Sequence, residues 1–427
     1  MSIRAFRARS DEQREAIYRF RYRVYVDELG LSPPEADHER RRLADVHDQF
    51  GLSYGLMEDG GNVVGSLRCI FMADVPDPAP LVAKFAMEPA VRSFGLAALV
   101  TTSRFMLDPK LRHGMSILHL MRAAYEDARA RGVRLNYGDC SPHMLPFYES
   151  MGYRRYVAPY NDTAYGFKLP IVMVVGDRQH FAAVRSPLAR LAEAHADDEQ
   201  ASEWFAATYP QWVQPTSAGL MEAGSFFDLL IERVASDPLH SVALFQGLSR
   251  EAIERFLASA TIVSASPGDR IVREGDRDDT VYVLLKGLAE VVRARTGQRP
   301  IAALGAGDLF GEIGFLTATP RIASVIARTP CEMLVLSGRR QLQKFLEGDP
   351  VVAARLLFNL SRILAGRLAE TTLQLPARRP ERNLKSHRTV ADRPQRRRSD
   401  VPSTPPLPPA ATTGAATASR TRNRRRA

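Results

Sequence analysis

The segment from Gly305 to Ala327 carries groups that suit a phosphate ester of a sugar. A short helix opening at Gly311 would present free N–H groups and the positive end of its dipole to an anion, and glycine lets the backbone approach closely. The guanidinium of Arg321 matches phosphate oxygens in charge and planar geometry. Glu312 is placed to accept hydrogen bonds from a ribose hydroxyl, and Ser324 to donate one to the phosphate. The alternative for Glu312 and Arg321 is a solvated ion pair beside a turn.

Charged residues also interrupt apolar segments in the N-terminal third of the chain. Arg68 and Arg104 both lie in runs that read as strands, and a charged residue inside a strand needs a partner when it is buried. Asp45 and Asp48 are the acidic residues that we expect to supply it. Such a pair serves structure as readily as it binds the carboxylate of a substrate.

The elements that position the phosphate-binding groups lie within residues 241–375. Two stretches, Pro267 to Asp276 and Val281 to Gly287, read as short strands separated by turn-forming Gly, Pro and Asp, which is a jelly-roll rhythm. Together with the motif described above, they resemble the cyclic-nucleotide-binding domain family. The resemblance implies binding of a 3′,5′-cyclic nucleotide, with Glu312 on the ribose and Arg321 on the cyclic phosphate.

The residue after Arg321 indicates which nucleotide the resemblance implies. In cGMP-preferring members it commonly carries a hydroxyl, and here it is Ile322, so we expect cAMP. Helices are expected at 340–346 and 350–375; in family members the second swings over the nucleotide or pairs between subunits, which makes a homodimer one expected arrangement. The implied binding residues are Gly311, Glu312, Ile313, Arg321, Ile322, Ala323 and Ser324.

Alternating helices and strands are predicted for residues 1–184, which gives a mixed α/β sandwich. Apolar residues at helical spacing mark the helices, and Asp59-Gly60-Gly61-Asn62 between two apolar segments is a strong hairpin signal. The predicted helices are 13–29 and 115–131, and the predicted strands are 50–57, 62–72, 133–138 and 164–175.

This first region resembles the GNAT N-acyltransferase fold, and within it the acyl-homoserine lactone (autoinducer) synthases and the long-chain N-acyl amino acid synthases. The resemblance implies transfer of an acyl group from a thioester to an amine. It also implies that Arg21, Asp45, Asp48, Arg68 and Arg104 shape the site for the amine acceptor and the acyl donor. The motifs that carry it are Arg21-Tyr22-Arg23-Val24-Tyr25, Asp45-Val46-His47-Asp48, Gly65-Ser66-Leu67-Arg68 and Ser103-Arg104-Phe105.

Two residues depart from the autoinducer synthase pattern. Thr101 stands where these enzymes usually have a glutamate, and Leu31 replaces the tryptophan of their first loop. Both departures favour an amine acceptor other than homoserine lactone. Without the glutamate, removal of the amine proton is assigned to Asp48, or to a water held by Asp45 and Asp48.

Aminolysis of a thioester needs a proton acceptor for the amine and preorganised donors for the oxyanion. In this fold a bulged strand supplies backbone N–H groups, and the start of the following helix holds pantetheine or pyrophosphate. The corresponding loop is Arg112-His113-Gly114-Met115-Ser116, a degenerate Gly-rich phosphate loop, which favours an acyl carrier protein over acyl-CoA as donor. Tyr148 stands where many GNAT enzymes keep a tyrosine that protonates the leaving thiolate; the alternative is an aromatic ring packed between helix and sheet.

Positive charge is concentrated at the C-terminal end. The net charge is +10, and residues 376–427 hold 14 Lys and Arg against 3 Asp and Glu, so the rest of the chain is nearly neutral. This Arg-, Pro-, Ala- and Thr-rich segment cannot bury enough apolar surface to fold alone. We predict a solvated tail, with nonspecific attraction to nucleic acid or an anionic membrane as the alternative. It takes the place where a catabolite-activator-type transcription factor would have its helix-turn-helix domain.

The cysteines, the histidines and the hydropathy of the chain indicate its expected location and whether disulfides or a metal site are expected. Three scattered cysteines predict core residues in a reducing cytoplasm and no disulfide framework. No segment approaches the roughly 20 apolar residues of a membrane span, and the N-terminus lacks a secretory signal, so we expect a soluble cytoplasmic protein. The histidines of the first region lack metal-ligand spacing, so no metal is expected. The cysteines are Cys69, Cys140 and Cys331, and the histidines are His113, His119 and His143.

The sequence therefore predicts four parts and a regulated enzyme. The expected function is a cAMP-regulated N-acyltransferase that acts on a small amine such as an amino acid. The alternatives are a protein-lysine acetyltransferase using acetyl-CoA, a non-enzymatic cAMP sensor with a decayed acyltransferase domain and, least favoured, a nucleic-acid binder using the tail. The parts are a GNAT-like domain (1–184), a helical connector with aromatics packed onto a domain (185–240), a cyclic-nucleotide-binding domain (241–375) and a disordered tail (376–427).

Overall fold

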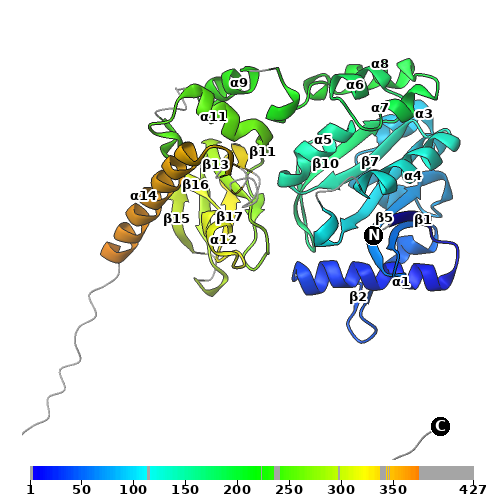
Figure 1. Ribbon diagram of the computed structural model, residues 1–427, viewed down its shortest axis with the longest axis horizontal. Coiled ribbons are helices and arrows are strands. Elements are labelled where there is room, and N and C mark those ends of the chain that lie inside the picture. Colours follow the sequence, from blue (N-terminus) through cyan, green and yellow to red (C-terminus); the bar gives the residue numbers. More distant parts are fainter. Residues whose placement is uncertain are drawn as a thin grey trace, which may run out of the picture. The chain divides into compact units, whose positions relative to one another are not determined.

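The computed structural model describes residues 3–374 apart from 113–115, 223, 235–240, 297–298, 337–342, 344 and 346. Met1–Leu373 form one compact unit, and Figure 1 labels many of its helices and strands. The predicted tail lies outside the described residues, and so does most of the predicted helix at 340–346.

An eight-stranded sheet forms the centre of the N-terminal region. The strand order is β1-β4-β5-β6-β7-β10-β8, with β9 paired to β10, and only the β6–β7 pair is parallel among the described strands. The predicted hairpin is confirmed, and the four predicted strands agree with the observed ones to within two residues at each end. The strands are β1 (Ile3–Arg7), β4 (Leu52–Glu58), β5 (Val63–Phe71), β6 (Leu99–Leu107), β7 (Leu135–Cys140), β8 (Arg154–Arg155), β9 (Tyr160–Asp162) and β10 (Gly166–Val174).

Helices cover both faces of this sheet. Since successive side chains of a strand point to opposite faces, Leu67 and Cys69 of β5 pack against one helical layer while Arg68 and Ile70 face the other. The first layer contains α4 (Ser116–Ala130), α5 (Leu145–Met151), α6 (Arg178–Ala183) and α7 (Ala189–Glu193). The second contains α1 (Asp11–Tyr22), α2 (Ala79–Lys84), α3 (Glu88–Phe94) and α8 (Glu199–Thr208).

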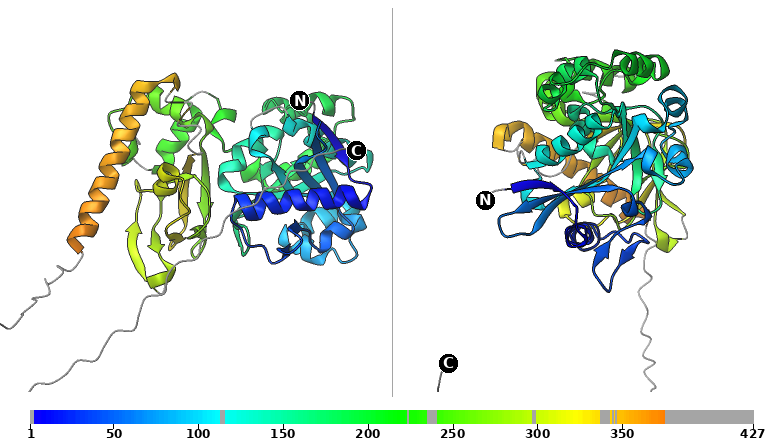
Figure 2. Two further views of the ribbon diagram at one scale, coloured as in Figure 1. Left: turned by 60° about the horizontal axis from the view of Figure 1, so that its bottom comes forward. Right: turned by 90° about the vertical axis from the view of Figure 1, so that its right-hand side faces the viewer.

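The first helix is built from two elements. α1 begins after Ser10, whose hydroxyl accepts from the N–H of Gln13 while the Gln13 side chain accepts from the Ser10 N–H, a reciprocal cap. From Arg23 the chain widens into a π-helix, η1 (Arg23–Glu28), so the predicted single helix at 13–29 is divided at this point. Figure 2 shows the dark-blue α1 lying across the strands of the sheet.

The C-terminal region is a β sandwich, as the jelly-roll rhythm predicts. Its two four-stranded antiparallel sheets have the orders β11-β18-β13-β16 and β12-β17-β14-β15, and α14 runs beside them in orange in Figures 1 and 2. The strands are β11 (Thr261–Ala265), β12 (Arg270–Val272), β13 (Val281–Lys286), β14 (Ala289–Val292), β15 (Pro300–Leu304), β16 (Leu309–Phe310), β17 (Ser324–Ala327) and β18 (Cys331–Leu336). The helices are α11 (Arg250–Phe256), α12 (Glu312–Thr317) and α14 (Pro350–Gln374).

The segment that joins the two regions combines α-helices with shorter turns where it is described, and it packs through its aromatic residues. It holds α7, α8 and α9 (Ser225–Val234). Trp204 meets Phe94 edge to face with ring centroids 5.1 Å apart, and the Arg155 guanidinium carbon lies 4.0 Å from the Trp212 ring centroid. The part of the segment up to Trp212 therefore packs against the N-terminal region, whereas α9 packs in the apolar cluster of the C-terminal region.

Two chain-wide expectations can be compared with the described residues. All three cysteines are buried and unpaired, so their predicted core positions are confirmed. Within the described ranges, every helix falls short of the length and hydropathy that crossing a membrane requires.

Candidate functional site

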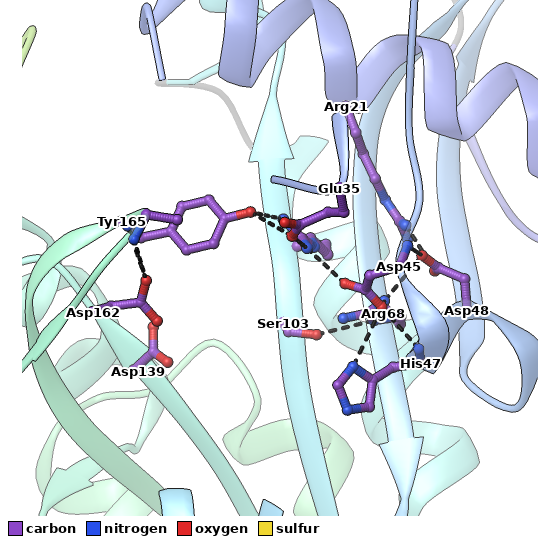
Figure 3. A network of polar contacts seen from close by, with 12 residues as sticks. Arg21, Glu35, Asp45, His47, Asp48, Arg68, Ser103, Asp139, Asp162 and Tyr165 are labelled. Carbon is purple, nitrogen blue, oxygen red and sulfur yellow. Dashed lines mark hydrogen bonds and ion pairs between the residues drawn. The ribbon is translucent and has the colours of Figure 1, made fainter. Parts of the chain in front are cut away.

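Five residues predicted to form the acyl-transfer site converge on one face of the N-terminal sheet. Figure 3 shows most of the side chains around this point. They come from α1, from a 3₁₀ turn η2 (Val46–Gln49) and the residue that caps it, and from the neighbouring strands β5 and β6. Elements distant in the sequence therefore bring these charges together. The five residues are Arg21, Asp45, Asp48, Arg68 and Arg104.

The turn η2 fixes both aspartates by a reciprocal cap. The Asp45 carboxylate accepts from the His47 N–H at 2.9 Å, and Asp48 Oδ2 accepts from the Asp45 N–H at 2.9 Å. Each carboxylate is thereby held by the backbone of the same turn, which leaves its remaining lone pairs facing the sheet.

Three arginines close a continuous network on these two carboxylates. Arg21 Nη1 lies 2.7 Å from Asp48 Oδ1, and its side chain is fully buried. Arg68 Nη1 contacts Asp45 Oδ1 at 2.6 Å and Asp48 Oδ2 at 3.0 Å, and Arg104 Nη2 contacts Asp45 Oδ2 at 2.6 Å. Every carboxylate oxygen of the two aspartates therefore has a cationic partner.

A third carboxylate, which the sequence interpretation missed, belongs to the same network. Glu35 Oε1 lies 2.6 Å from Arg104 Nη2 and accepts a hydrogen bond from the Tyr165 hydroxyl at 3.0 Å. The Arg104 guanidinium also donates to the Tyr165 hydroxyl, and its central carbon lies 5.5 Å from the Tyr25 ring and 5.3 Å from the Tyr165 ring. The sequence signal for Glu35 is weak, since the residue only follows a Pro-Pro pair in a loop.

A β-bulge in β6 explains how adjacent residues reach the same cluster. Between the paired positions Ser66–Met106 and Arg68–Ser103, β6 contains one residue more than β5. Arg104 in this stretch has φ +54°, a left-handed conformation that costs a non-glycine residue about 1–3 kcal/mol. Because the bulge breaks the alternation of the strand, Ser103 can accept from Arg68 Nε at 3.2 Å while Arg104 reaches Asp45.

Electrostatics keep both aspartates ionised. Burial alone would raise the pKa of each carboxyl. For Asp45 the hydrogen bonding by His47 and the charge of Arg68 outweigh burial, and for Asp48 the charge of Arg21 does so, which leaves both pKa values below the usual range. A carboxylate with a lowered pKa is a weak base, so the pair is better suited to hold arginines than to take up a proton.

This lowered pKa gives a testable pH dependence. The Asp48 contribution to stability is fully present above its unfolded-state value of 3.8 and is lost as the pH falls through the lower folded-state pKa. We expect the unfolding temperature of the full chain to fall more steeply between about pH 4 and pH 2 than that of Asp48→Asn, so the two curves converge in acid. Glu126→Gln, at an exposed pair with Arg122, is the control. Parallel curves for the chain and Asp48→Asn would contradict the lowered pKa.

A cleft of about 690 Å³ lies beside the two aspartates. Tyr18, Arg42 and Phe50 contribute to its walls together with Asp45 and Asp48. Its volume falls in the range that small-molecule sites occupy. The charged cluster therefore borders a space that can admit a small polar ligand.

The other residues predicted for this site stand apart from the polar network. Thr101 is buried, and its Oγ1 lacks a hydrogen-bond partner among the described residues. Tyr148 packs edge to face against Phe105 and Tyr153, and burial raises its pKa, so the phenol remains protonated. In the predicted phosphate loop, Arg112 pairs with Glu28 and Ser116 begins α4, while His113, Gly114 and Met115 lie outside the described residues.

The predicted nucleotide-binding residues gather at α12 and β17. α12 begins directly after Gly311, as expected, and Gly311 has φ +87°. A Cβ there would lie 2.6 Å from the Thr280 carbonyl oxygen, so only glycine fits without a shift. Arg321 is 4% exposed; its Nε and Nη2 donate to the Asp278 carboxylate at 3.0 and 2.6 Å, and its Nη1 donates to the Gly311 carbonyl at 2.6 Å.

Glu312 and Arg321 therefore do not form the solvated pair considered as an alternative. Both are buried, and Glu312 Oε1 lies 2.8 Å from Arg367 Nη1 of α14. Ser324 Oγ accepts from the Glu274 N–H at 2.9 Å, and Ile322 is 46% exposed. Ile313 and Ala323 are half-buried at the same site. The long C-terminal helix thus contacts the carboxylate assigned to the ribose.

Two family models match separate parts of the chain. Residues 16–175 match the N-acyl amino acid synthase FeeM, and residues 262–349 match the cyclic nucleotide-binding domain. The chain thus carries an N-terminal region that resembles N-acyl amino acid synthases and a C-terminal cyclic nucleotide-binding domain.

Individual relatives match one region at a time. A cyclic AMP receptor protein of Thermus thermophilus is 33% identical over 134 residues, which are 31% of this chain and 60% of that protein. A cAMP-dependent protein kinase regulatory subunit of Mycosarcoma maydis is 31% identical over 109 residues, which are 25% of this chain and 20% of that protein. The chain spans less than two thirds of either relative. The structure of FeeM from uncultured soil microbes is 16% identical, with a TM-score of 0.35 over 44% of this chain and 97% of FeeM.

Proposed function

We propose that this chain is an N-acyltransferase that moves an acyl group from a thioester to a small amine, such as an amino acid, and that a cyclic nucleotide regulates it. We assign the transferase to residues 1–184, the nucleotide domain to 241–375 and a connector to 185–240. The match of residues 16–175 to an N-acyl amino acid synthase carries the proposal. The buried cluster of arginines and carboxylates beside a cleft supports it.

The bulge in β6 supports a role in acyl transfer. An unpaired residue in a strand leaves backbone groups that the neighbouring strand does not satisfy, and N–H groups at such a position can stabilise the thioester oxyanion. Arg104, held at φ +54° by the network, orients this part of the strand. The protonated phenol of Tyr148 is the donor that we assign to the leaving thiolate, and an acyl carrier protein is the donor substrate that we favour over acyl-CoA.

Regulation is supported by hydrogen bonds between the nucleotide site and the turn after β9. Arg273 donates to the carbonyl oxygens of Thr163 at 2.9 Å and Ala164 at 3.2 Å. The same guanidinium binds Asp276 Oδ1 at 2.8 Å, and the Arg321 N–H donates to the Asp276 carbonyl at 2.8 Å. The main chain of Arg321 is thus linked to this turn through Asp276 and Arg273.

The turn also bears on the transferase site. Tyr165, the next residue, donates to Glu35 and shares Arg104 with it. A coupling of about 1–3 kcal/mol would change the affinity for donor or acceptor roughly 5- to 150-fold. We favour cAMP as the ligand because Ile322 stands where cGMP-preferring members commonly carry a hydroxyl residue.

Lipid mass spectrometry on bacterial cells that express the full chain tests the transferase. We expect N-acylated amines whose masses identify acyl chain and acceptor, and we expect their loss in Arg104→Lys, since lysine keeps the charge but not the planar fork. Arg122→Lys, at an exposed arginine on α4, should leave them unchanged. Identical lipids with and without the folded chain, with cAMP supplied, would refute the transferase.

Purified protein tests the regulation. Transfer rates measured with and without cAMP should differ, and Arg273→Ala should abolish the difference while cAMP still binds. An Arg273→Ala chain that keeps the full response would exclude the hydrogen bonds to Thr163 and Ala164 as the route.

A further inference from the structure

The three carboxylates of the cluster differ in how many of their oxygens accept hydrogen bonds from the protein. Asp45 and Asp48 use both oxygens on arginines and on backbone N–H groups of η2. Glu35 uses Oε1 on Arg104 and Tyr165, whereas no described residue donates to its Oε2. The exposed fractions of the side chains follow the same order, with 4% for Asp48, 14% for Asp45 and 23% for Glu35.

The surroundings of Glu35 suit a positively charged amine. The rings of Tyr25 and Tyr165 lie with centroids 5.3 Å apart beside the same arginine. Aromatic faces attract an ammonium group, and an adjacent carboxylate adds a charge-assisted hydrogen bond. Arg104 and the Tyr165 hydroxyl both donate to Oε1, which restricts the orientation of the carboxylate and so of Oε2.

Other groups near the cluster are poorer proton acceptors. The oxygens of Asp45 and Asp48 are occupied as described above, and the Thr101 hydroxyl is not a base at neutral pH. A proton acceptor must lie within hydrogen-bond reach of the amine and have an accessible lone pair. The Oε2 atom of Glu35 has an accessible lone pair. Because Glu35 lies beside the arginine cluster, Oε2 is also within reach of an amine that binds next to Arg104.

Resting on the proposed acyl transfer, we infer that Glu35 binds the ammonium group of the acceptor and removes its proton. The ammonium N–H donates to Oε2 and transfers one proton to it. The freed lone pair then attacks the thioester carbonyl carbon, so that a C–N bond forms and the C–S bond breaks. The Tyr148 phenol gives its proton to the departing sulphur and is reprotonated by the second proton that the nitrogen loses, and Glu35 returns the first proton to solvent. The products are an amide and a thiol.

The pH dependence of Glu35→Gln tests this inference. The assay uses the full chain with cAMP, acyl-loaded carrier protein and a mixture of the proteinogenic amino acids. Glutamine keeps the size and can still accept from Arg104 and Tyr165, but it cannot take up a proton. We expect kcat/KM to fall about 10²- to 10⁴-fold at neutral pH, and the defect to shrink as the pH rises and the amine loses its proton unaided. Glu35→Asp should retain part of the activity.

Controls separate this role from a structural one. Glu39→Gln, at an exposed glutamate of the same loop region, should match the wild-type profile. cAMP binding and the unfolding temperature report whether Glu35→Gln remains folded. A folded Glu35→Gln chain with wild-type activity, or with an equal defect at every pH, would overturn the assignment. An inactive wild-type chain would instead refute the proposed transferase.

Discussion

Arg321→Leu should reduce the affinity of the chain for cAMP by at least about 30-fold. Truncating a buried, hydrogen-bonded charge that binds an opposite charge costs about 2–5 kcal/mol or more, and 1.4 kcal/mol is a factor of ten. Arg321 is buried and already forms a two-point contact with Asp278, so its geometry suits a phosphate of similar shape. Isothermal titration calorimetry with cAMP measures the loss directly.

The control for this prediction is an arginine of the same sandwich that lies away from the site. Arg328→Leu removes an exposed pair with Glu290 and should leave cAMP affinity within a factor of two or three. Arg321→Lys keeps the charge but loses the two-point geometry, and we expect intermediate affinity. Equal affinity in Arg321→Leu and the wild type would remove Arg321 from the phosphate site.

Arg21→Met should destabilise the chain more than any exposed charge change. Breaking a buried ion pair by removing one partner costs about 3–5 kcal/mol, because the other charge remains buried without compensation. Here Asp48, whose side chain is 4% exposed, would keep Arg68 at Oδ2 but lose the cation at Oδ1, and Ser53 and Ser66 would also lose the guanidinium that donates to them. Urea unfolding, followed by the signal of the N-terminal region, measures the change in the free energy of unfolding.

A double-mutant cycle checks the origin of this loss. Arg21→Met combined with Asp48→Leu should cost less than the sum of the two single changes, since both partners of the buried contact are then removed together. Arg19→Met, which removes an exposed pair with Glu15 on the same helix, should change stability by less than about 1 kcal/mol. Simple additivity of Arg21→Met and Asp48→Leu would show that the pair does not carry the effect.

The five charged residues of the cluster could be predicted because each lies in a short motif that resembles a known family. Glu35 and Tyr165 could not, since their contacts with Arg104 join positions 69 and 61 residues apart and follow no local pattern. The same holds in the nucleotide site, where Asp278 and Arg367 lie 43 and 55 residues from the residues they bind. The acidic or basic partner of a motif residue is set by the fold and not by spacing.

The elements of the fold likewise divide into those with a local sequence signal and those without one. The β4–β5 hairpin could be predicted from Asp59-Gly60-Gly61-Asn62, because glycine permits the tight turn between alternating apolar strands. The change from α1 to the π-helix η1 has no such signal, since both helices place apolar residues on nearly the same face over one turn. The bulge at Arg104 likewise depends on the pairing of β6 with β5, which a single strand does not reveal.

The bonds from Arg273 end on the main chain of the turn after β9. Every residue has a main-chain carbonyl that can accept a hydrogen bond, so other residues can replace Thr163 and Ala164 without loss of these bonds. The turn keeps its shape through Asp162, whose carboxylate accepts the N–H groups of Ala164 and Tyr165. Related chains should therefore vary in sequence at positions 163 and 164 while they retain Asp162 and Arg273.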